Sequence, residues 1–448
     1  MSKKNIVLTS FFSACLTLSL PLTALAQEKE GQNDTALLER LNQLEQEISA
    51  IKDKLNAVAT DKVEIDKKLS TKNDTSVKWK GAPEVKSQGG WSIKPRGRML
   101  YDFSNLSSVP SSIDIPGEGF SNEARRVRLG IQGSMPGGFA YKLEADFLDG
   151  TTLTDAYLDY KSDGLKIIIG QHNNFQGLEE LSSSNDTSFI ERAAFTDAFG
   201  FERKVGISAS YKVADINLEG GVFTDNIDNL NDGNNSHSVD VRAYLAPKIE
   251  GKQWHVGASV HWRNLAESTD TVRYRARPMV HTVDTRFINT NNIAGADTET
   301  GLGLEFGLIA DRFHAMAEMY SLMLDRNGFE DASFFGGAIE AGYFLTNDAR
   351  QYQGGIFKGV KVSEPLGAGG MGAWQINVRF DRLDLVDADI VGGTQNAYMT
   401  SLIWTPVNNV RFLVNYGHIK YSDALGIVEG APQDFSVNVV GARTQVSF

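Results

Sequence analysis

Arginines spaced two residues apart are the side chains with the clearest chemistry in this sequence. They occur as Arg96 and Arg98, as Arg126 and Arg128, and as Arg273, Arg275 and Arg277. In an extended segment, residues two apart project on one side with a rise of about 6.5–7 Å, and a guanidinium stays protonated at every relevant pH. This spacing lets a small anion pass from one weak site to the next. The alternative for the last three is a surface loop, ended by Pro278, whose arginines face lipopolysaccharide or bulk water.

The other reactive side chains form no catalytic or metal-binding pattern. Glu179 and Glu180 could suggest general acid–base catalysis, but nothing nearby supplies a nucleophile, and a solvated loop end is the simpler interpretation. The seven histidines show no metal-ligand spacing, and no glycine-rich phosphate-binding loop precedes a helix. We therefore expect no enzymatic activity, no metal site and no cofactor.

Composition and the first residues indicate an exported, acidic protein. The 448-residue chain carries a net charge of −12, which argues against nucleic acid as a partner. Residues 1–26 place Lys3 and Lys4 before an apolar run and end in Ala24-Leu25-Ala26, the pattern of a secretory signal peptide. Its removal takes away two lysines and no acid, so the net charge becomes −14. Cys15, the only cysteine, leaves with it; a lipoprotein signal at Cys15 is the alternative.

A heptad pattern follows a polar spacer over residues 27–36. Apolar residues recur at alternating spacings of four and three, which indicates a coiled coil: Leu37, Leu41, Leu44, Ile48, Ile51, Leu55 and Val58. Leucine at position a with β-branched residues at d disfavours dimers, so we expect a trimeric coiled coil over residues 37–69. A lone amphipathic helix on the rim of a barrel is the alternative. Residues 70–90, which contain charges followed by Gly and Pro, are interpreted as a linker.

From residue 91 to residue 448 the apolar period becomes two, as in β-strands. In one such segment, Trp374, Ile376 and Val378 alternate with Gln375 and Asn377. The polar face is charged in strand after strand, and short turns alternate with longer connections such as 104–121 and 288–300, as in outer-membrane barrels. We therefore predict an all-β membrane protein, a 16-stranded antiparallel transmembrane β-barrel with an N-terminal coiled-coil helix. The segment ending at Phe448 is similar to the assembly signal of bacterial outer-membrane proteins.

One connection is too long for a simple turn. About thirty residues separate two short alternating segments, KIIIG and VGISASYKV, and such a length indicates a functional or disordered loop. Eight apolar side chains between Phe175 and Phe201 argue against disorder. We predict that residues 171–203 fold inside the barrel as a pore-constricting loop, with Phe175, Glu179, Glu180, Asn185 and Asp186 at the constriction.

Several motifs resemble the phosphate-selective porin O and P family in their order along the chain: RRVRLGIQG, YKLEADF, TDAYLDYK, GQHNNFQGLEELSSSNDTSFIERA, RKVGI, YRARP and GAWQINVRFDRLDL. The resemblance implies a sixteen-stranded barrel, three copies per assembly, and arginines that guide anions. Arg98, Arg126 and Arg128 match the family's first two strands. The predicted constriction loop departs from phosphate-specific members, which place lysines there. Its acids include Glu179, Glu180, Asp186 and Glu191, against only Arg192 and, at its end, Arg203 and Lys204.

Together these patterns predict a porin in the outer membrane of a Gram-negative bacterium, with the coiled coil in the periplasm. Its partners would be outer-membrane lipid, small inorganic or organic anions such as phosphate, two further copies in a homotrimer, and a periplasmic or cell-wall partner of the coiled coil. The alternative is a general or cation-tolerant porin whose coiled coil acts mainly as an envelope spacer. The expected pore-lining, anion-binding residues are Arg96, Arg98, Arg126, Arg128, Arg192, Arg203, Arg273, Arg275, Arg277, Arg379 and Arg443.

Overall fold

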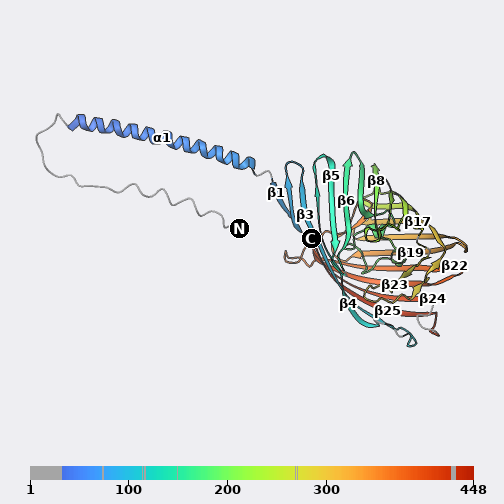
Figure 1. Ribbon diagram of the computed structural model, residues 1–448. Helices are drawn as coiled ribbons and strands as arrows, with labels where there is room; N and C mark the ends of the chain where they lie inside the picture. Colours follow the sequence, from blue (N-terminus) through green and yellow to red (C-terminus); the bar gives the residue numbers. More distant parts are fainter. Residues whose placement is uncertain are drawn as a thin grey trace. The chain divides into compact units, whose positions relative to one another are not determined.

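The computed structural model describes residues 33–72, 75–113, 115, 118–148, 150–267, 269, 271–424 and 430–448. The predicted signal peptide therefore lies outside the described residues, as does most of the spacer. The chain divides into two units, residues 1–74 and residues 75–448, shown in Figure 1. In the described part of the chain, no helix is both long enough and apolar enough to cross a bilayer.

The first unit contains helix α1 (Asn33–Lys72), which begins and ends a few residues outside the predicted 37–69. Its interior holds neither glycine nor proline, the two residues that most disfavour a helix. The heptad side chains from Leu41 to Val58 lie exposed on the single helix, from 48% for Leu44 to 66% for Val58. Among the described residues of its unit, this exposed apolar stripe has no partner, so the coiled coil stays a prediction.

Part of the predicted linker is a β-hairpin. Strand β1 (Thr75–Lys80) pairs with β2 (Ala82–Ser87), and Gly81 makes the turn at a φ of +79°, which glycine adopts without strain. Strand β2 in turn pairs with the start of the barrel through Val85 and Ile93. Residues 75–87, part of the segment that the sequence predicts to be a linker, therefore add two strands to the sheet at β3.

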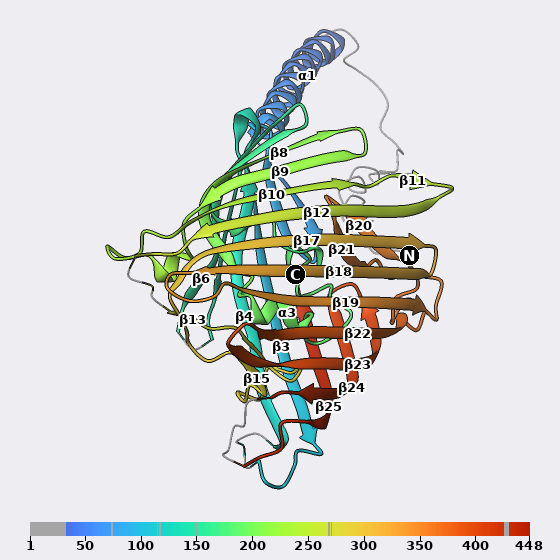
Figure 2. The same cartoon turned by 90° about the vertical axis from the view of Figure 1, so that its right-hand side faces the viewer.

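Sixteen antiparallel strands form the closed barrel, as predicted, because each pairs with the next and the last pairs with the first (Figures 1 and 2). The strands are β3 (Ser92–Ser107), β4 (Gly119–Ser134), β5 (Phe139–Asp146), β6 (Thr152–Ser162), β7 (Leu165–Asn173), β8 (Arg203–Val213), β9 (Ile216–Phe223), β10 (His237–Leu245), β12 (Lys252–Asn264), β17 (Ala296–Ala310), β18 (Phe313–Arg326), β19 (Ala332–Phe344), β22 (Ala373–Asp387), β23 (Ile390–Val407), β24 (Val410–Ser422) and β25 (Phe435–Ser447).

Alternation along each strand separates an apolar outer face from a polar inner face. In β22, Ile376 and Val378 are 44% and 56% exposed on the outside, whereas Asn377 and Arg379 are buried inside the barrel. The same pattern recurs in β17, where Leu302 and Leu304 face outward. An outer band of this kind is suited to hydrocarbon, where every backbone group must be paired within the barrel.

At one end of the seam between β25 and β3, an aromatic ring packs on a glycine. The backbone groups of Gly97 and Phe448 exchange two hydrogen bonds of 3.0 and 3.2 Å. The Phe448 ring occupies the place of the missing Gly97 side chain, since a Cβ at Gly97 would lie 2.2 Å from a ring carbon. A larger residue at position 97 would therefore displace this ring from its place.

Three long connections turn into the lumen. The constriction loop holds α2 (Leu178–Leu181) and α3 (Ala194–Ala198), and Figure 2 shows α3 within the ring of strands. The second, here called the inward loop (residues 265–295), holds the short pairs β13 (Thr271–Val272) with β16 (Ile293–Ala294) and β14 (Arg275–Ala276) with β15 (Ile288–Asn289). The third, the inner hairpin (residues 345–372), contains β20 (Arg350–Gln353) and β21 (Ile356–Val360).

These connections enter from opposite ends of the barrel. The constriction loop and the inward loop both follow strands that run in the direction of β3, whereas the inner hairpin leaves the end that otherwise carries short turns. Remaining short elements are η1 (Pro136–Gly138), η2 (Ile227–Asn229) and β11 (Lys248–Ile249). Phe195 and Phe201 of the constriction loop pack with Phe287 of the inward loop in one apolar cluster, and Phe357 of the inner hairpin packs on Leu178.

Candidate functional site

The constriction loop is hydrogen-bonded along its length to one side of the barrel. Wall carboxylates accept from its backbone amides: Glu318 accepts from Leu178 and, at 2.9 Å, from Glu179, and Asp381 accepts from Ala194 at 3.0 Å. Wall arginines donate to its carbonyls: Arg350 to Asp186 at 2.6 Å and Arg411 to Thr187 at 2.5 Å. These wall residues belong to β18, β22, β24 and the inner hairpin, so the loop lies against that side.

Two arginines predicted to line the pore are instead anchors of this loop. Arg379, whose side chain is fully buried, pairs with Glu179 of the loop and with Glu340 of β19 at 2.7 Å. Arg443 pairs with Asp102 at 2.6 Å and donates to the Ile190 carbonyl at 2.7 Å. Inward-facing polar residues on this side therefore meet the loop and not a water-filled path.

The predicted constriction residues divide between the loop's two sides. Glu179 is 2% exposed and accepts from the Ala193 amide at 2.9 Å, so it is not the solvated end that the sequence suggested. The Asn185 carbonyl accepts from Gln445, and the Asp186 carbonyl is held by Arg350. Phe175 and Glu180 alone of the five line the open space on the other side.

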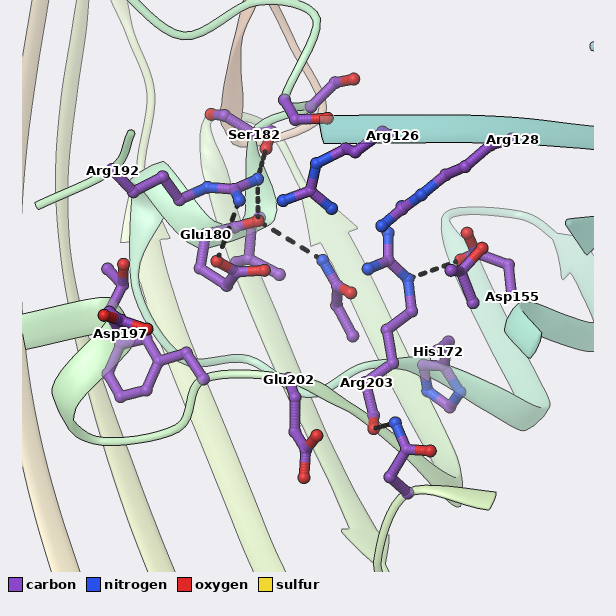
Figure 3. Close-up of a pocket in the computed structure, with 18 of the residues that line it drawn as sticks. Arg126, Arg128, Asp155, His172, Glu180, Ser182, Arg192, Asp197, Glu202 and Arg203 are labelled. Atoms are coloured by element: carbon purple, nitrogen blue, oxygen red, sulfur yellow. Dashed lines mark hydrogen bonds and ion pairs between the residues drawn. The ribbon is translucent and has the colours of Figure 1, made fainter. Parts of the chain in front are cut away.

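That open space is a cavity of about 840 Å³ between the constriction loop and strands β3 to β7 (Figure 3). Eleven cationic side chains line it: Arg96, Arg98, Arg125, Arg126, Arg128, Lys142, Lys166, Arg192, Arg203, Arg277 and Lys358. Six carboxylates face them: Asp155, Glu180, Glu191, Asp197, Glu202 and Asp228. Eleven against six leaves an excess of five positive charges. We call this cavity the basic pocket.

Ion pairs cancel part of this charge within the wall. Arg98 pairs with Glu144 at 3.3 Å, and Arg128 pairs with Asp146 at 2.8 Å. Asp155 is shared by Lys142 at 2.8 Å and Arg203 at 3.3 Å, and Figure 3 shows the Arg203 contact at the centre of the pocket. Two further pairs reach the loop acids: Arg125 with Glu191 at 2.9 Å and Arg192 with Glu180 at 3.3 Å.

A smaller set of pocket charges has no partner. Within the described residues, Arg126, Lys166 and Lys358 make no hydrogen bond or ion pair, and the same holds for the carboxylates of Glu202 and Asp228. Arg96 donates only to the neutral Gln132. The uncompensated charge in the basic pocket is therefore concentrated on a few named side chains.

A β-bulge explains why two consecutive arginines face the same cavity. Leu100 of β3 pairs with Arg126, but the next residue, Tyr101, pairs with Ala124, so Arg125 is the extra residue on β4. A bulge re-aims the side chains around it. Strict alternation assigned Arg126 and Arg128 to the lumen and missed Arg125.

The YRARP arginines extend the positive surface towards the end of the barrel from which the constriction loop enters. Arg273 and Arg275 line a second cavity of about 380 Å³, and Arg277 lines the basic pocket. Asp197, Gly200 and Glu202 line both cavities. The Asp197 carboxylate accepts from the Arg277 amide at 3.0 Å, which ties the inward loop to the constriction loop.

Burial changes the titration of two groups in these loops. It raises the pKa of Glu202 above its ordinary value, a shift that nearby Lys204 opposes and Asp225 reinforces. It also lowers the pKa of Arg286 to about 10, with Arg277 contributing. Arg286 therefore stays protonated at neutral pH, whereas Glu202 takes up a proton at a higher pH than a free glutamate would.

Four pocket cations were absent from the predicted set: Arg125, Lys142, Lys166 and Lys358. Lys142 and Lys166 lie on predicted strands, and their inward position follows from the same alternation that identified the arginines. Lys358 comes from the inner hairpin, for which alternation gives no signal because it folds back from the turn end of the barrel.

Comparison with known proteins agrees with the resemblance in the sequence. The family model for phosphate-selective porin O and P matches residues 93–448. A protein of Caulobacter vibrioides is 42% identical over 385 residues, covering 84% of this chain and 77% of that protein. Porin O of Pseudomonas aeruginosa is 25% identical over 357 residues, covering 72% and 79%. Among solved structures, an anion-selective porin from Comamonas acidovorans superposes with a TM-score of 0.52 at 11% identity, covering 80% of this chain and all of that one.

The structural likeness establishes the fold, and the family match covers the whole barrel. A closed sixteen-stranded barrel with an apolar outer band and a charged lumen is the architecture of an outer-membrane channel. The chain therefore belongs to the phosphate-selective porin O and P family and is an outer-membrane porin.

Proposed function

We propose that this porin is a passive channel for small hydrophilic solutes that favours anions, phosphate among them. The pocket cations without a carboxylate partner in the described structure carry the proposal: Arg96, Arg126, Lys166 and Lys358, against the two unpaired carboxylates of Glu202 and Asp228. A lumen with one prevailing sign of charge concentrates the opposite ion in a narrow, low-dielectric space. One solved structure of the same fold is named as an anion-selective porin.

The path we propose runs from the second cavity to the basic pocket. Arg273 and Arg275 meet the solute first, and Arg277 carries it past the constriction loop towards Arg126. Arg275 makes no ion pair within the described residues, and Arg273 donates only to the neutral Asn289 at 2.8 Å. Sites of this kind are weak enough to release an anion to the next one.

The wild-type porin should show an anion-selective reversal potential across a salt gradient in a planar bilayer. Replacing Arg273, Arg275 and Arg277 together by alanine should move that potential towards cations, because their charges are fixed at every relevant pH. The shift should shrink at 1 M salt, where the screening length falls to about 3 Å. An unchanged potential in the triple variant at low salt would place these arginines outside the path.

We also propose that α1 joins three copies through a coiled coil in the periplasm. The exposed stripe from Leu41 to Val58 supports this, since apolar side chains at heptad spacing bury one another when helices associate. Leucine at a with Ile51 and Val58 at d favours the trimer. Such a helix would reach about 50 Å at 1.5 Å per residue, which also suits it as a spacer or tether to a cell-wall partner.

Deleting residues 37–69 should leave a folded, conducting barrel but weaken association of the copies. The basic pocket and the constriction loop lie entirely in the second unit, so the deletion removes none of their contacts. Sedimentation in detergent and single-channel recording measure the two effects separately. A truncated protein that inserts but conducts no current would make the helix part of the pore.

A further inference from the structure

The basic pocket contains free charges of both signs. Arg126 enters it from β4, and Glu202 enters it from the end of the constriction loop, each without a hydrogen bond or ion pair in the described part of the chain. Figure 3 labels both and shows them on different elements around the same space. An unpaired carboxylate in the wall repels anions, so a pocket that binds only anions would not be expected to contain one.

The neighbours of Glu202 do not neutralise it, because they are engaged elsewhere. Lys204 pairs with Asp225 at 3.3 Å, and Arg263 pairs with the same carboxylate at 2.9 Å. Asp228, on η2, adds a second unpaired carboxylate to the lining of this pocket. The pocket therefore has an acidic pole at Glu202 and Asp228.

The neighbours of Arg126 are engaged in the same way. Glu191 accepts from Arg125 at 2.9 Å and from Arg443 at 3.2 Å, and Glu180 pairs with Arg192. Of the pocket carboxylates, only those of the acidic pole, Glu202 and Asp228, are therefore left without a cation in the described structure. The guanidinium of Arg126 is the basic pole, supplied by the barrel wall, whereas Glu202 is supplied by the constriction loop.

A solute with a single charge satisfies only one of these poles. An anion held at Arg126 leaves Glu202 unpaired and is repelled by it, and a cation held at Glu202 is repelled by Arg126. A zwitterion can bring its acidic group to Arg126 and its ammonium to Glu202. The volume of about 840 Å³ is ample for a molecule of a few carbon atoms with its water.

We propose that the basic pocket favours small zwitterions, solutes with one anionic group and one ammonium group, over anions of the same size. The proposal rests on the proposed function only in taking the basic pocket as part of the solute path. It assigns Arg126 and Glu202 as the two residues that determine this preference.

Taurine and isethionate provide a direct test, because they differ only in an ammonium against a hydroxyl on the same sulfonate frame. Fluxes of the two labelled solutes into liposomes that contain the porin are measured at pH 7.5 and low salt. Wild type should pass taurine faster than isethionate. Glu202→Gln should slow taurine and speed isethionate, which lowers the flux ratio by roughly two- to five-fold, the size expected of one partly exposed ion pair.

Arg126→Gln should slow both solutes, since both carry the sulfonate. Asp228→Asn provides a second acidic-pole variant and should lower the ratio in the same direction. Glu250→Gln, on an exposed turn away from both cavities, is the matched control and should leave the ratio unchanged. Single-channel conductance verifies that each variant has inserted and folded.

An unchanged flux ratio in both Glu202→Gln and Asp228→Asn would overturn the zwitterion proposal, as would a wild type that passes isethionate at least as fast as taurine. Neither result touches the anion preference, which is read from the reversal potential. Conversely, a wild type without anion-selective reversal potential but with the expected taurine ratio would retain this inference and reject the proposed function.

Discussion

Arg379→Ala should free the constriction loop from the barrel wall and replace one stable conductance level by a broad, noisy distribution. The substitution leaves the buried carboxylate of Glu179 without a cation, whereas Glu340 keeps Arg350 at 3.3 Å. Removing one partner of a buried ion pair costs about 3–5 kcal/mol. It also removes the contact of the guanidinium with the Phe189 ring, 4.4 Å from its centroid.

Single-channel recordings measure this effect, and Arg382→Ala is the matched control. Arg382 lies on the same strand, but its partner is Asp384 and its side chain is 41% exposed, so its loss should change little. Electrophoretic mobility before and after heating checks that both barrels are folded. If Arg379→Ala keeps the wild-type conductance and noise, the loop does not depend on this anchor.

The variant that replaces Arg126, Lys166 and Lys358 by glutamine should lose most of the anion preference while keeping its fold. These cations have no ion pair in the described structure, so their removal leaves no carboxylate orphaned. A charge about 7 Å from a permeating ion contributes on the order of 0.5 kcal/mol in water. Three such charges change the concentration of the anion in the pocket by about ten-fold and that of a cation by about ten-fold in the opposite direction, so the anion-to-cation permeability ratio falls by about a hundred-fold at low salt.

A second triple variant separates the pocket from the net charge of the protein. Lys212, Lys248 and Lys252 are three exposed lysines that lie outside the basic pocket, so they match the first variant in the number of charges removed. Their replacement by glutamine removes equal charge and should leave the reversal potential near the wild-type value. Equal shifts in the two triple variants would show that selectivity does not arise in the basic pocket.

The barrel was predictable because its cause is local and repeated. Ile376, Val378 and Phe380 face the hydrocarbon, whereas Asn377 and Arg379 face the lumen. Because the two environments alternate along each strand, apolar residues recur at every second position of the sequence. The constriction loop was predictable for a related reason. Phe189, Phe195 and Phe201 need a buried environment, which a long surface loop does not provide.

Alternation could not predict which inward-facing side chains line open space and which contact a folded loop. It assigns Arg379 and Arg443 to the inside, but whether an inward arginine meets water or a folded loop depends on contacts with residues 200 or more positions away. The inner hairpin was missed because long connections are not expected at the short-turn end of a barrel. The second long loop was expected at 288–300, whereas the connection runs over 265–295 and its own short strands resemble barrel strands.

The seam between β3 and β25 also constrains how the protein is made. Its partners, such as Arg98 and Ser447, lie far apart in the sequence, so closing the ring carries a large loop-closure entropy and is intrinsically slow. Until β25 arrives, two strand edges stay open, and an open edge invites pairing with any other chain. A nascent porin of this kind must therefore be shielded during export until β25 has paired with β3 along the whole seam.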